Sequence, residues 1–181
     1  MNAATQNYFE LFGLPVCYEV DQPKLAEHYR ELQRAVHPDK YANASDQDRR
    51  MSVQKAAQIN EAFQTLKSPI RRARYMLEMR GIEFDDQRET AIDPMFLMEQ
   101  MELRETLADI PHSDNGLVKL GQLQDDIQQK VKALTNELIE LFKNDSDDAM
   151  ARARANMHKL QFMDKLQQEA ENVEEDIANA F

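Results

Sequence analysis

The sequence predicts an all-α protein with two modules, an N-terminal helical hairpin and a C-terminal three-helix bundle. Apolar residues recur at three- and four-residue spacing along most of the 181 residues, as in amphipathic helices. At Asp21, Ser68 and Asp93, a capping residue is followed within two positions by proline, which marks a helix start. Both observations favour helices throughout the chain.

The charge is divided unevenly between the two modules. Residues 1–75 hold 11 Lys and Arg against 9 Asp and Glu, whereas residues 76–181 hold 11 against 24. The net charges are therefore +2 and −13, which favours two modules with different partners. An acidic surface that only keeps the helices soluble is the alternative explanation of the total charge.

The N-terminal module, residues 1–80, is expected to contain four helices. Their predicted ranges are 8–11, 23–36, 46–66 and 70–80, and glycines at positions 13 and 81 end the first and the fourth. The second helix presents one apolar face, made by Leu25, Tyr29, Leu32 and Val36. Ile59, Phe63 and Leu66 should face it from the third helix. Arg30 and Arg34 lie on the opposite face of the second helix and should be exposed.

The tripeptide His37-Pro38-Asp39 lies between the second and third helices. Pro38 cannot continue the preceding helix, and it biases His37 away from helical backbone angles. The three residues should therefore form an exposed, stiffened loop at the end of the hairpin. Lys40 adds a positive charge beside it.

The C-terminal module, residues 93–181, follows a linker expected at 81–92, where charged residues show no clear period. Three helices are predicted, over 93–110, 117–142 and 148–181, separated by polar breaks. Helices joined by such short connections are typical of an antiparallel bundle.

The 93–110 helix carries more apolar residues than one buried face needs. Its inward residues are expected to be Phe96, Leu103, Leu107 and Ile110. Leu97, Met98 and Met101 lie on another side, together with the acidic residues Glu102, Glu105 and Asp109. An exposed apolar patch with an acidic rim predicts a partner site, and methionine suits an adaptable surface. Cover by the linker or another helix is the alternative. Phe162, two positions after Leu160, is expected to be a further outward apolar group.

Composition excludes several classes of protein. No run of 18 apolar residues and no signal-peptide pattern is found, so a soluble cytoplasmic protein without a membrane role is expected. The single cysteine, Cys17, fits a reducing compartment. Four glycines without a glycine-rich loop argue against a nucleotide site, and the net charge of −11 argues against nucleic-acid binding.

The sequence also argues against catalysis and metal binding. His37 and Asp39 are too close, with proline between them, to act as two members of a catalytic triad. No activated Ser or Cys is evident. No metal or other cofactor is expected, because the cysteine and the four histidines lack ligand spacing; these residues are Cys17, His28, His37, His112 and His158.

Several motifs resemble those of a known family. Residues 8–15 (YFELFGLP), 37–41 (HPDKY) and 68–69 (SP) resemble the J-domain of DnaJ-type co-chaperones, over roughly the first 75 residues. Residues 96–105 (FLMEQMELRE) and 159–166 (KLQFMDKL) extend the likeness. The whole chain resembles the HscB family, the J-type co-chaperones of bacterial iron–sulfur cluster assembly.

The resemblance implies two binding surfaces and no catalytic site of the chain's own. The first would engage HscA, a DnaK-type chaperone, and stimulate its ATPase; its residues would be Tyr29, Arg30, Arg34, His37, Pro38, Asp39 and Lys40. The second would hold the scaffold protein IscU; its residues would be Leu97, Met98, Met101, Glu102, Glu105, Asp109 and Phe162. A monomer is expected.

The sequence departs from general DnaJ proteins in two respects. Glu31 and Ala35 stand where many J-domains carry basic residues, so binding to a general DnaK should be weaker. The Gly/Phe-rich region and the zinc-binding cysteine repeats are absent from this sequence, which argues against a broad unfolded-client role. A helical adaptor without a chaperone link is the remaining alternative, and it leaves the His-Pro-Asp loop unexplained.

Overall fold

The computed structural model describes residues 6–41, 44–84 and 93–179, and every regular element in these ranges is helical. Cα packing divides the chain into two compact units, residues 1–76 and 77–181. The predicted all-α fold class is therefore confirmed. No helix of the described ranges is long and apolar enough to cross a membrane.

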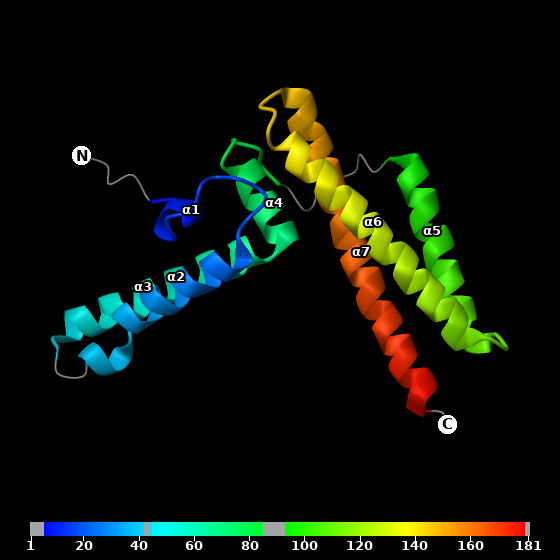
Figure 1. Cartoon of the computed structure of the whole chain (residues 1–181), viewed down its shortest axis with the longest axis horizontal. Coiled ribbons are helices and arrows are strands. Elements are labelled where there is room, and N and C mark those ends of the chain that lie inside the picture. Colours follow the sequence, from blue (N-terminus) through cyan, green and yellow to red (C-terminus); the bar gives the residue numbers. More distant parts are fainter. Residues whose placement is uncertain (1–5, 42–43, 85–92, 180–181) are drawn as a thin grey trace. The chain divides into compact units, whose positions relative to one another are not determined.

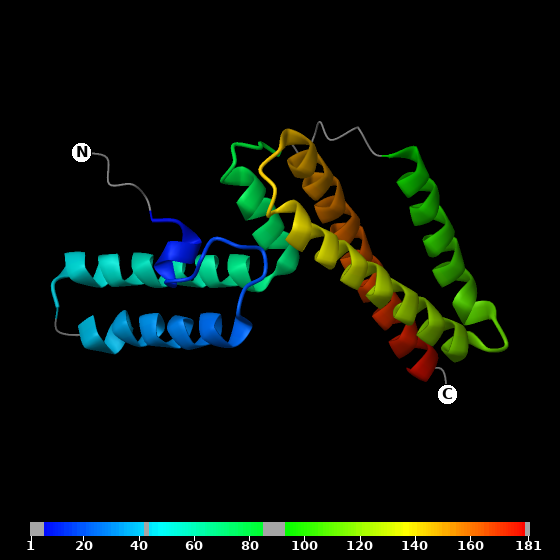
Figure 2. The same ribbon diagram turned by 45° about the horizontal axis from the view of Figure 1, so that its top comes forward.

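The N-terminal unit is built on a helical hairpin (Figure 1). Its elements are α1 (Tyr8–Leu11), α2 (Gln22–Ala35), the 3-10 helix η1 (Pro38–Tyr41), α3 (Asp46–Lys67) and α4 (Pro69–Glu78). Helices α2 and α3 run side by side in opposite directions, and α1 packs against α3 (Figure 2). The fourth helix ends at Glu78 rather than at Arg80, because the chain turns there and Gly81 adopts a φ of 78°.

Capping side chains define where most of these helices begin. Asp21 accepts a hydrogen bond from the Lys24 N–H at 3.0 Å, and Ser45 accepts one from the Asp48 N–H at 3.2 Å. Asn7 and Glu10 form a reciprocal capping box around α1. These contacts satisfy N–H groups that have no partner within the helix, which is why short polar residues precede each helical run.

Aromatic and aliphatic packing holds the N-terminal unit together. Leu25 of α2 and Leu66 of α3 are fully buried, which confirms the predicted facing stripes. The Tyr8 ring stacks on Tyr75 with centroids 4.4 Å apart, and the Tyr8 N–H donates to the Tyr75 hydroxyl at 2.9 Å. Because Phe9 is also fully buried, the short α1 is fixed by side-chain packing rather than by its own single turn.

Arg72 of α4 is a buried charge that the sequence pattern did not indicate. Its guanidinium lies 4.9 Å from the centroid of the Tyr18 ring, and its Nη1 donates to the Leu66 carbonyl oxygen. Burial raises the pKa of Tyr18 to about 12, although the charge of Arg72 opposes this rise. Arg72 thereby joins the loop before α2 to the corner between α3 and α4.

The C-terminal unit consists of three long helices and a 3-10 turn. They are α5 (Pro94–Asp109), η2 (Ile110–His112), α6 (Gly116–Leu141) and α7 (Asp147–Asn179). Helices α6 and α7 form an antiparallel pair, and α5 packs on α7 (Figures 1 and 2). Gly116 is required at the start of α6, because a Cβ there would lie 2.8 Å from the Ile110 carbonyl oxygen.

One apolar cluster joins all three helices of this unit. It contains Phe96, Leu107 and Ile110; Leu120, Leu123 and Ile127; and Phe162, Met163, Leu166 and Ala170. The predicted inward face of the 93–110 helix is thus confirmed, with Leu103 partly buried against the cluster. Because residues of all three helices share this cluster, the unit is a three-helix bundle, as the sequence indicated.

Only the first part of the predicted linker over 81–92 can be described. Phe84 meets the His158 ring edge-on, with centroids 6.2 Å apart, and lies 5.1 Å below the Arg154 guanidinium. Both partners belong to α7, so Phe84 is held on the C-terminal unit. The remaining linker positions, 85–92, lie outside the described residues.

Candidate protein-binding sites

The first candidate site lies at the end of the α2–α3 hairpin, where α2 stops and η1 begins. Val36 is buried at this turn, whereas His37 and Asp39 are exposed. The Lys40 N–H donates to the His37 carbonyl oxygen at 3.0 Å and closes the turn. The predicted loop is therefore a short 3-10 helix that begins at Pro38, where the missing N–H costs no helical hydrogen bond.

Two contacts join His37 to Asp39, and they need different protonation states of the ring. The Asp39 N–H donates to His37 Nδ1 at 3.3 Å, which requires this nitrogen to be unprotonated. A protonated Nδ1 would instead pair with Asp39 Oδ2, 3.5 Å away. The Asp39 side chain is 91% exposed, and no Lys or Arg in the described part of the chain pairs with it. Its carboxylate can therefore accept hydrogen bonds from a partner.

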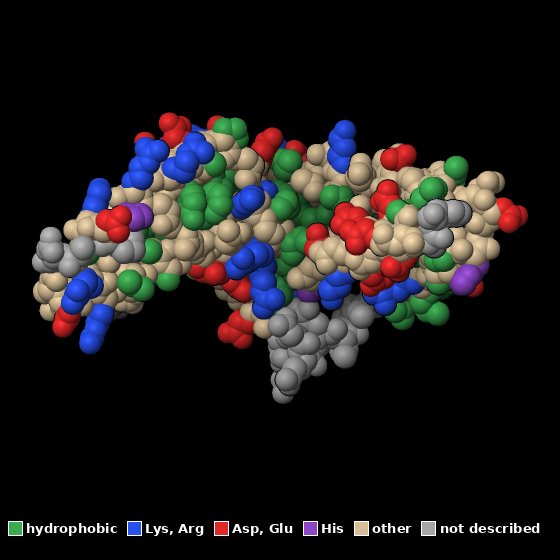
Figure 3. Space-filling view, turned by 90° about the horizontal axis from the view of Figure 1, so that it is seen from below, with side chains coloured by type: hydrophobic (Ala, Val, Ile, Leu, Met, Phe, Trp, Pro, Cys, Tyr) green, Lys and Arg blue, Asp and Glu red, His purple; other side chains and the backbone are tan. Residues whose placement is uncertain are grey.

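Basic residues flank this turn. Arg30 and Arg34 on α2 and Lys40 in η1 are exposed, as predicted. On the face drawn in Figure 3, Lys and Arg side chains (blue) are spread over the hairpin end of the N-terminal unit, at left.

Tyr29 of the same predicted surface is half-buried. Its ring stacks on Phe63 with centroids 4.0 Å apart, and its hydroxyl donates a hydrogen bond to Asn60 Oδ1 at 2.8 Å. Its main contacts thus fix α2 against α3.

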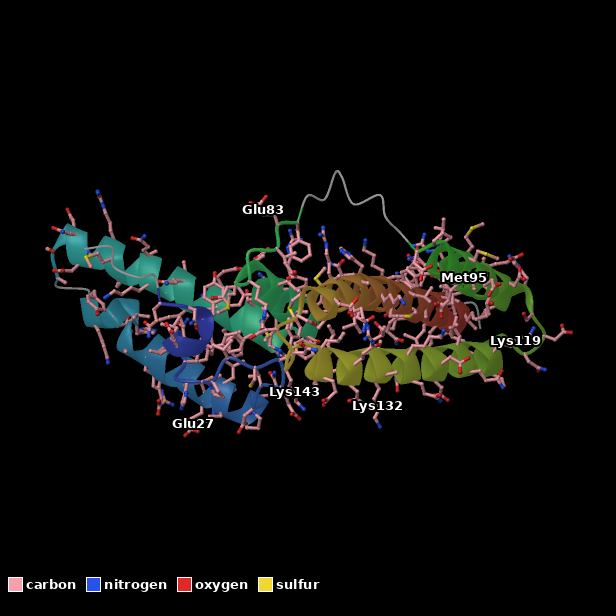
Figure 4. The ribbon with its side chains drawn as sticks, turned by 90° about the horizontal axis from the view of Figure 1, so that it is seen from above. Glu27, Glu83, Met95, Lys119, Lys132 and Lys143 are labelled. Carbon is pink, nitrogen blue, oxygen red and sulfur yellow. The ribbon has the colours of Figure 1, made fainter. Side chains whose placement is uncertain are left out.

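The second candidate site is the outer side of α5. Leu97, Met98 and Met101 are 46%, 57% and 66% exposed, and the acidic residues around them, Glu102, Glu105 and Asp109, are exposed too. We call these six residues the α5 patch. Cover by another helix of the same unit, one of the alternatives left open by the sequence, is excluded by these exposures. The linker positions 85–92, the other alternative, lie outside the described residues. In Figure 4, methionine sulfur atoms project from α5 on the side away from α7.

A pocket of about 320 Å³ opens beside the α5 patch, between the first turns of α5 and the middle of α7. Its apolar lining is Met95, Phe96 and Met98, and its charged lining is Asp93, Glu99, Glu102 and Lys159. Met95, labelled in Figure 4, is 72% exposed and was missed in the sequence although it precedes Met98 by one helical turn. We call this cavity the α5–α7 pocket.

Comparison with known proteins decides the family. The DnaJ domain family matches residues 7–75, and the family described as HSCB C-terminal oligomerisation domain matches residues 92–171. A co-chaperone protein HscB homolog from Shewanella halifaxensis is 50% identical over 169 residues, which cover 93% of this chain and 97% of the relative. The chain belongs to the HscB family. It is therefore a co-chaperone with a J-domain and an HscB-type C-terminal domain.

Solved HscB structures agree with this fold. Chaperone HscB from Vibrio cholerae is 42% identical with a TM-score of 0.86, covering 94% of this chain and 99% of that one. Human co-chaperone protein HscB is 27% identical with a TM-score of 0.83, covering 93% of this chain and 82% of that one. Each of these two solved proteins thus shares the fold of this chain over more than 90% of its length.

Phe162, expected to be an outward residue of the scaffold-binding surface, lies instead within the core of this HscB-family chain. It is 8% exposed, and its ring meets Phe96 edge-on with centroids 5.7 Å apart. The guanidinium of Arg104 covers the ring, 5.6 Å from its centroid. Arg104 in turn pairs with Glu169 of α7 at 3.3 Å. The prediction failed because α7 is covered by α6 on one side and by α5 on another, so two of its faces are buried.

A metal site would require several titratable side chains close together. Among the residues that the structure describes, no group of three or more His, Cys, Asp or Glu side chains is placed to hold a metal ion. Cys17 is half-buried, and burial raises the pKa of its thiol, which disfavours the reactive thiolate.

Proposed function

We propose that this co-chaperone binds an IscU-type iron–sulfur scaffold, delivers it to an HscA-type chaperone and stimulates the chaperone's ATPase, which aids cluster assembly and transfer. One observation carries this proposal: two chemically different exposed surfaces lie on different units, the Asp39 turn on the first and the α5 patch on the second. One chain that holds both partners raises their effective concentration for each other.

The chaperone surface would work by weak, directed contact. Exposed Arg30, Arg34 and Lys40 favour fast, salt-sensitive encounter with an acidic partner. The Asp39 carboxylate would then pair with an arginine of the chaperone, while Pro38 restricts the turn so that little entropy is lost on docking. ATP hydrolysis remains the chemistry of the chaperone, whose population the co-chaperone would shift toward a hydrolysis-competent state.

The scaffold surface would work by apolar anchoring. Leu97, Met98 and Met101 are large, exposed and adjacent on one helix, and the acids around them would form the rim of a small hot spot. Methionine side chains adapt to an irregular partner at low cost because they are flexible and unbranched. Phe162 supports this surface from below through Phe96.

We propose further that the protein acts in the cytoplasm as a monomer, with a J-domain over 1–80 and a scaffold-binding domain over 93–181 joined by the linker 81–92. The matching C-terminal family is described as an oligomerisation domain, so the monomer is the part of this proposal most open to test. Sedimentation velocity across a hundredfold range of concentration should give a single monomeric species. A dimer at micromolar concentration would overturn this point.

The test is steady-state ATPase of an HscA-type chaperone, with this protein and an IscU-type scaffold added singly and together. The wild type should stimulate, and the scaffold should add synergy. Asp39→Asn should abolish stimulation, and a Leu97/Met98/Met101→Ala triple variant should keep stimulation but lose the synergy. A helical adaptor without a chaperone link would instead tolerate Asp39→Asn, and no stimulation by the wild type would sink the assigned function.

A further inference from the structure

The α5–α7 pocket shares Met98 and Glu102 with the α5 patch and extends from it to Lys159 of α7. At about 320 Å³ it lies near the lower end of the range for small-ligand pockets, about 300–1,000 Å³. Its size suits one extended side chain of a partner rather than a folded loop. Its position at the edge of the α5 patch means that a protein bound to the patch would reach it.

The charges around the pocket favour a positively charged occupant. Three carboxylates, Asp93, Glu99 and Glu102, line it against the single ammonium group of Lys159, which leaves a net charge of −2. Glu99 is partly compensated because it pairs with Lys130 of α6. Glu102 is exposed, and no cation of the described chain pairs with its carboxylate.

The partial charge at the N-terminus of α5 reduces the negative potential of the pocket but does not reverse its sign. The N-terminus of α5 carries a partial positive charge that opposes a cation. Asp93 offsets that charge, because its carboxylate caps the helix by accepting the Met95 N–H at 3.0 Å. Lys159 is held over the Phe96 ring, 5.5 Å from its centroid, so it sits against the apolar wall.

The apolar walls of the pocket favour a cation that carries an apolar stem. Met95, Met98 and Phe96 present thioether and aromatic surface, which packs against methylene groups. A lysine or arginine side chain has an apolar stem that can lie on these walls and a charged end that can pair with Glu102. A small inorganic cation would use the carboxylates but leave the apolar walls unpaired.

We propose that the α5–α7 pocket receives a lysine or arginine side chain of the scaffold protein bound at the α5 patch. This inference rests on the proposed function, since it names the group by which that partner is recognised. The apolar patch supplies anchoring, and the pocket supplies register, because a single cation fits beside Glu102.

Two substitutions with opposite expected signs test the occupant. Glu102→Gln removes an attractive charge and should weaken binding of an IscU-type scaffold about fivefold, whereas Lys159→Met removes a repulsive one and should strengthen it about threefold. Dissociation constants would be measured by isothermal titration calorimetry. Asp125→Asn, an exposed acid on α6 that does not line the pocket, is the control for long-range charge effects.

A double-mutant cycle then identifies the partner residue. Each exposed lysine or arginine of the scaffold would be changed to methionine and paired with Glu102→Gln. One position should couple by about fivefold or more, and the same position should show no coupling to Asp125→Asn.

The outcomes separate this inference from the proposed function. If the wild type binds the scaffold but no scaffold cation couples to Glu102, the inference is wrong and the function stands. Reversed signs for Glu102→Gln and Lys159→Met would mean an acidic occupant, and effects no larger than the control would mean an apolar one; both overturn it. If the wild type fails to bind the scaffold, the proposed function itself fails.

Discussion

The two units of this co-chaperone present surfaces of opposite character. The N-terminal unit offers a stiff 3-10 turn with an exposed carboxylate beside basic residues, whereas the C-terminal unit offers flexible methionines with acidic residues around them. A stiff, charged turn suits brief and directional contact. A soft apolar patch suits retention of a partner with an irregular surface. Under the proposed function, the first surface would transmit a signal to the chaperone while the second would hold the scaffold.

The largest expected effect is that of Asp39→Asn. Loss of a hydrogen-bonded charge that docks against a partner costs about 2–5 kcal/mol, so ATPase stimulation should fall at least thirtyfold. The scaffold dissociation constant should not change, because Asp39 belongs to the other unit. Glu31→Gln, which removes an exposed acid of α2, is the matched control. Equal losses in both assays would show that the two surfaces are not independent.

Phe162→Ala should have the next largest effect, and it should act through stability. Removing a buried phenylalanine costs about 3–5 kcal/mol, so thermal unfolding of the C-terminal unit should shift to lower temperature. Phe162→Leu keeps apolar volume and should restore both the melting temperature and scaffold binding. A Phe162→Leu variant that folds normally but binds the scaffold poorly would make Phe162 a direct contact rather than a support.

Met98→Ala should weaken scaffold binding about tenfold, as expected for an anchor within a hot spot. Basal stimulation of the chaperone, measured without scaffold, should be unchanged. Met51→Ala is the matched control, because Met51 is a similarly exposed methionine on α3. If both substitutions affected scaffold binding equally, the α5 patch would lose its special role.

The smallest expected effect is a difference in salt dependence between chaperone stimulation and scaffold binding. Raising NaCl shortens the screening length from about 10 Å at 0.1 M to about 3 Å at 1 M, which weakens exposed charge contacts. Half-maximal stimulation of the ATPase should therefore need several-fold more co-chaperone, whereas the scaffold dissociation constant should change less because apolar contacts dominate it. Parallel salt dependences would contradict the division between a charged and an apolar surface.

Much of this molecule follows from local patterns. Pro38 and its neighbours predict the exposed turn because a proline cannot continue a helix that precedes it, whatever the surrounding fold. The α5 patch could be found because Leu97, Met98 and Met101 fall on a helical face that Phe96 and Leu107 do not share. Met95 could have been found in the same way, since it lies one turn before Met98.

Other features depend on which helices meet. Phe162 could not be placed from the spacing of α7, because that helix packs against α6 and α5 at once. Arg72 reads as an ordinary exposed helical residue, yet it is buried against Tyr18, which is 54 positions earlier in the chain. The α5–α7 pocket joins Glu102 to Lys159 in the same manner.

The sequence by itself determined the helices, their caps, the exposed turn and the apolar surplus on α5, since each depends on residues within a few positions of one another. Only the tertiary structure decided that Phe162 is core, that Arg72 is buried and that acids and methionines enclose a pocket with Lys159. The physical reason is that helical periodicity specifies which side of a helix is apolar, whereas burial depends on how many other helices pack against it.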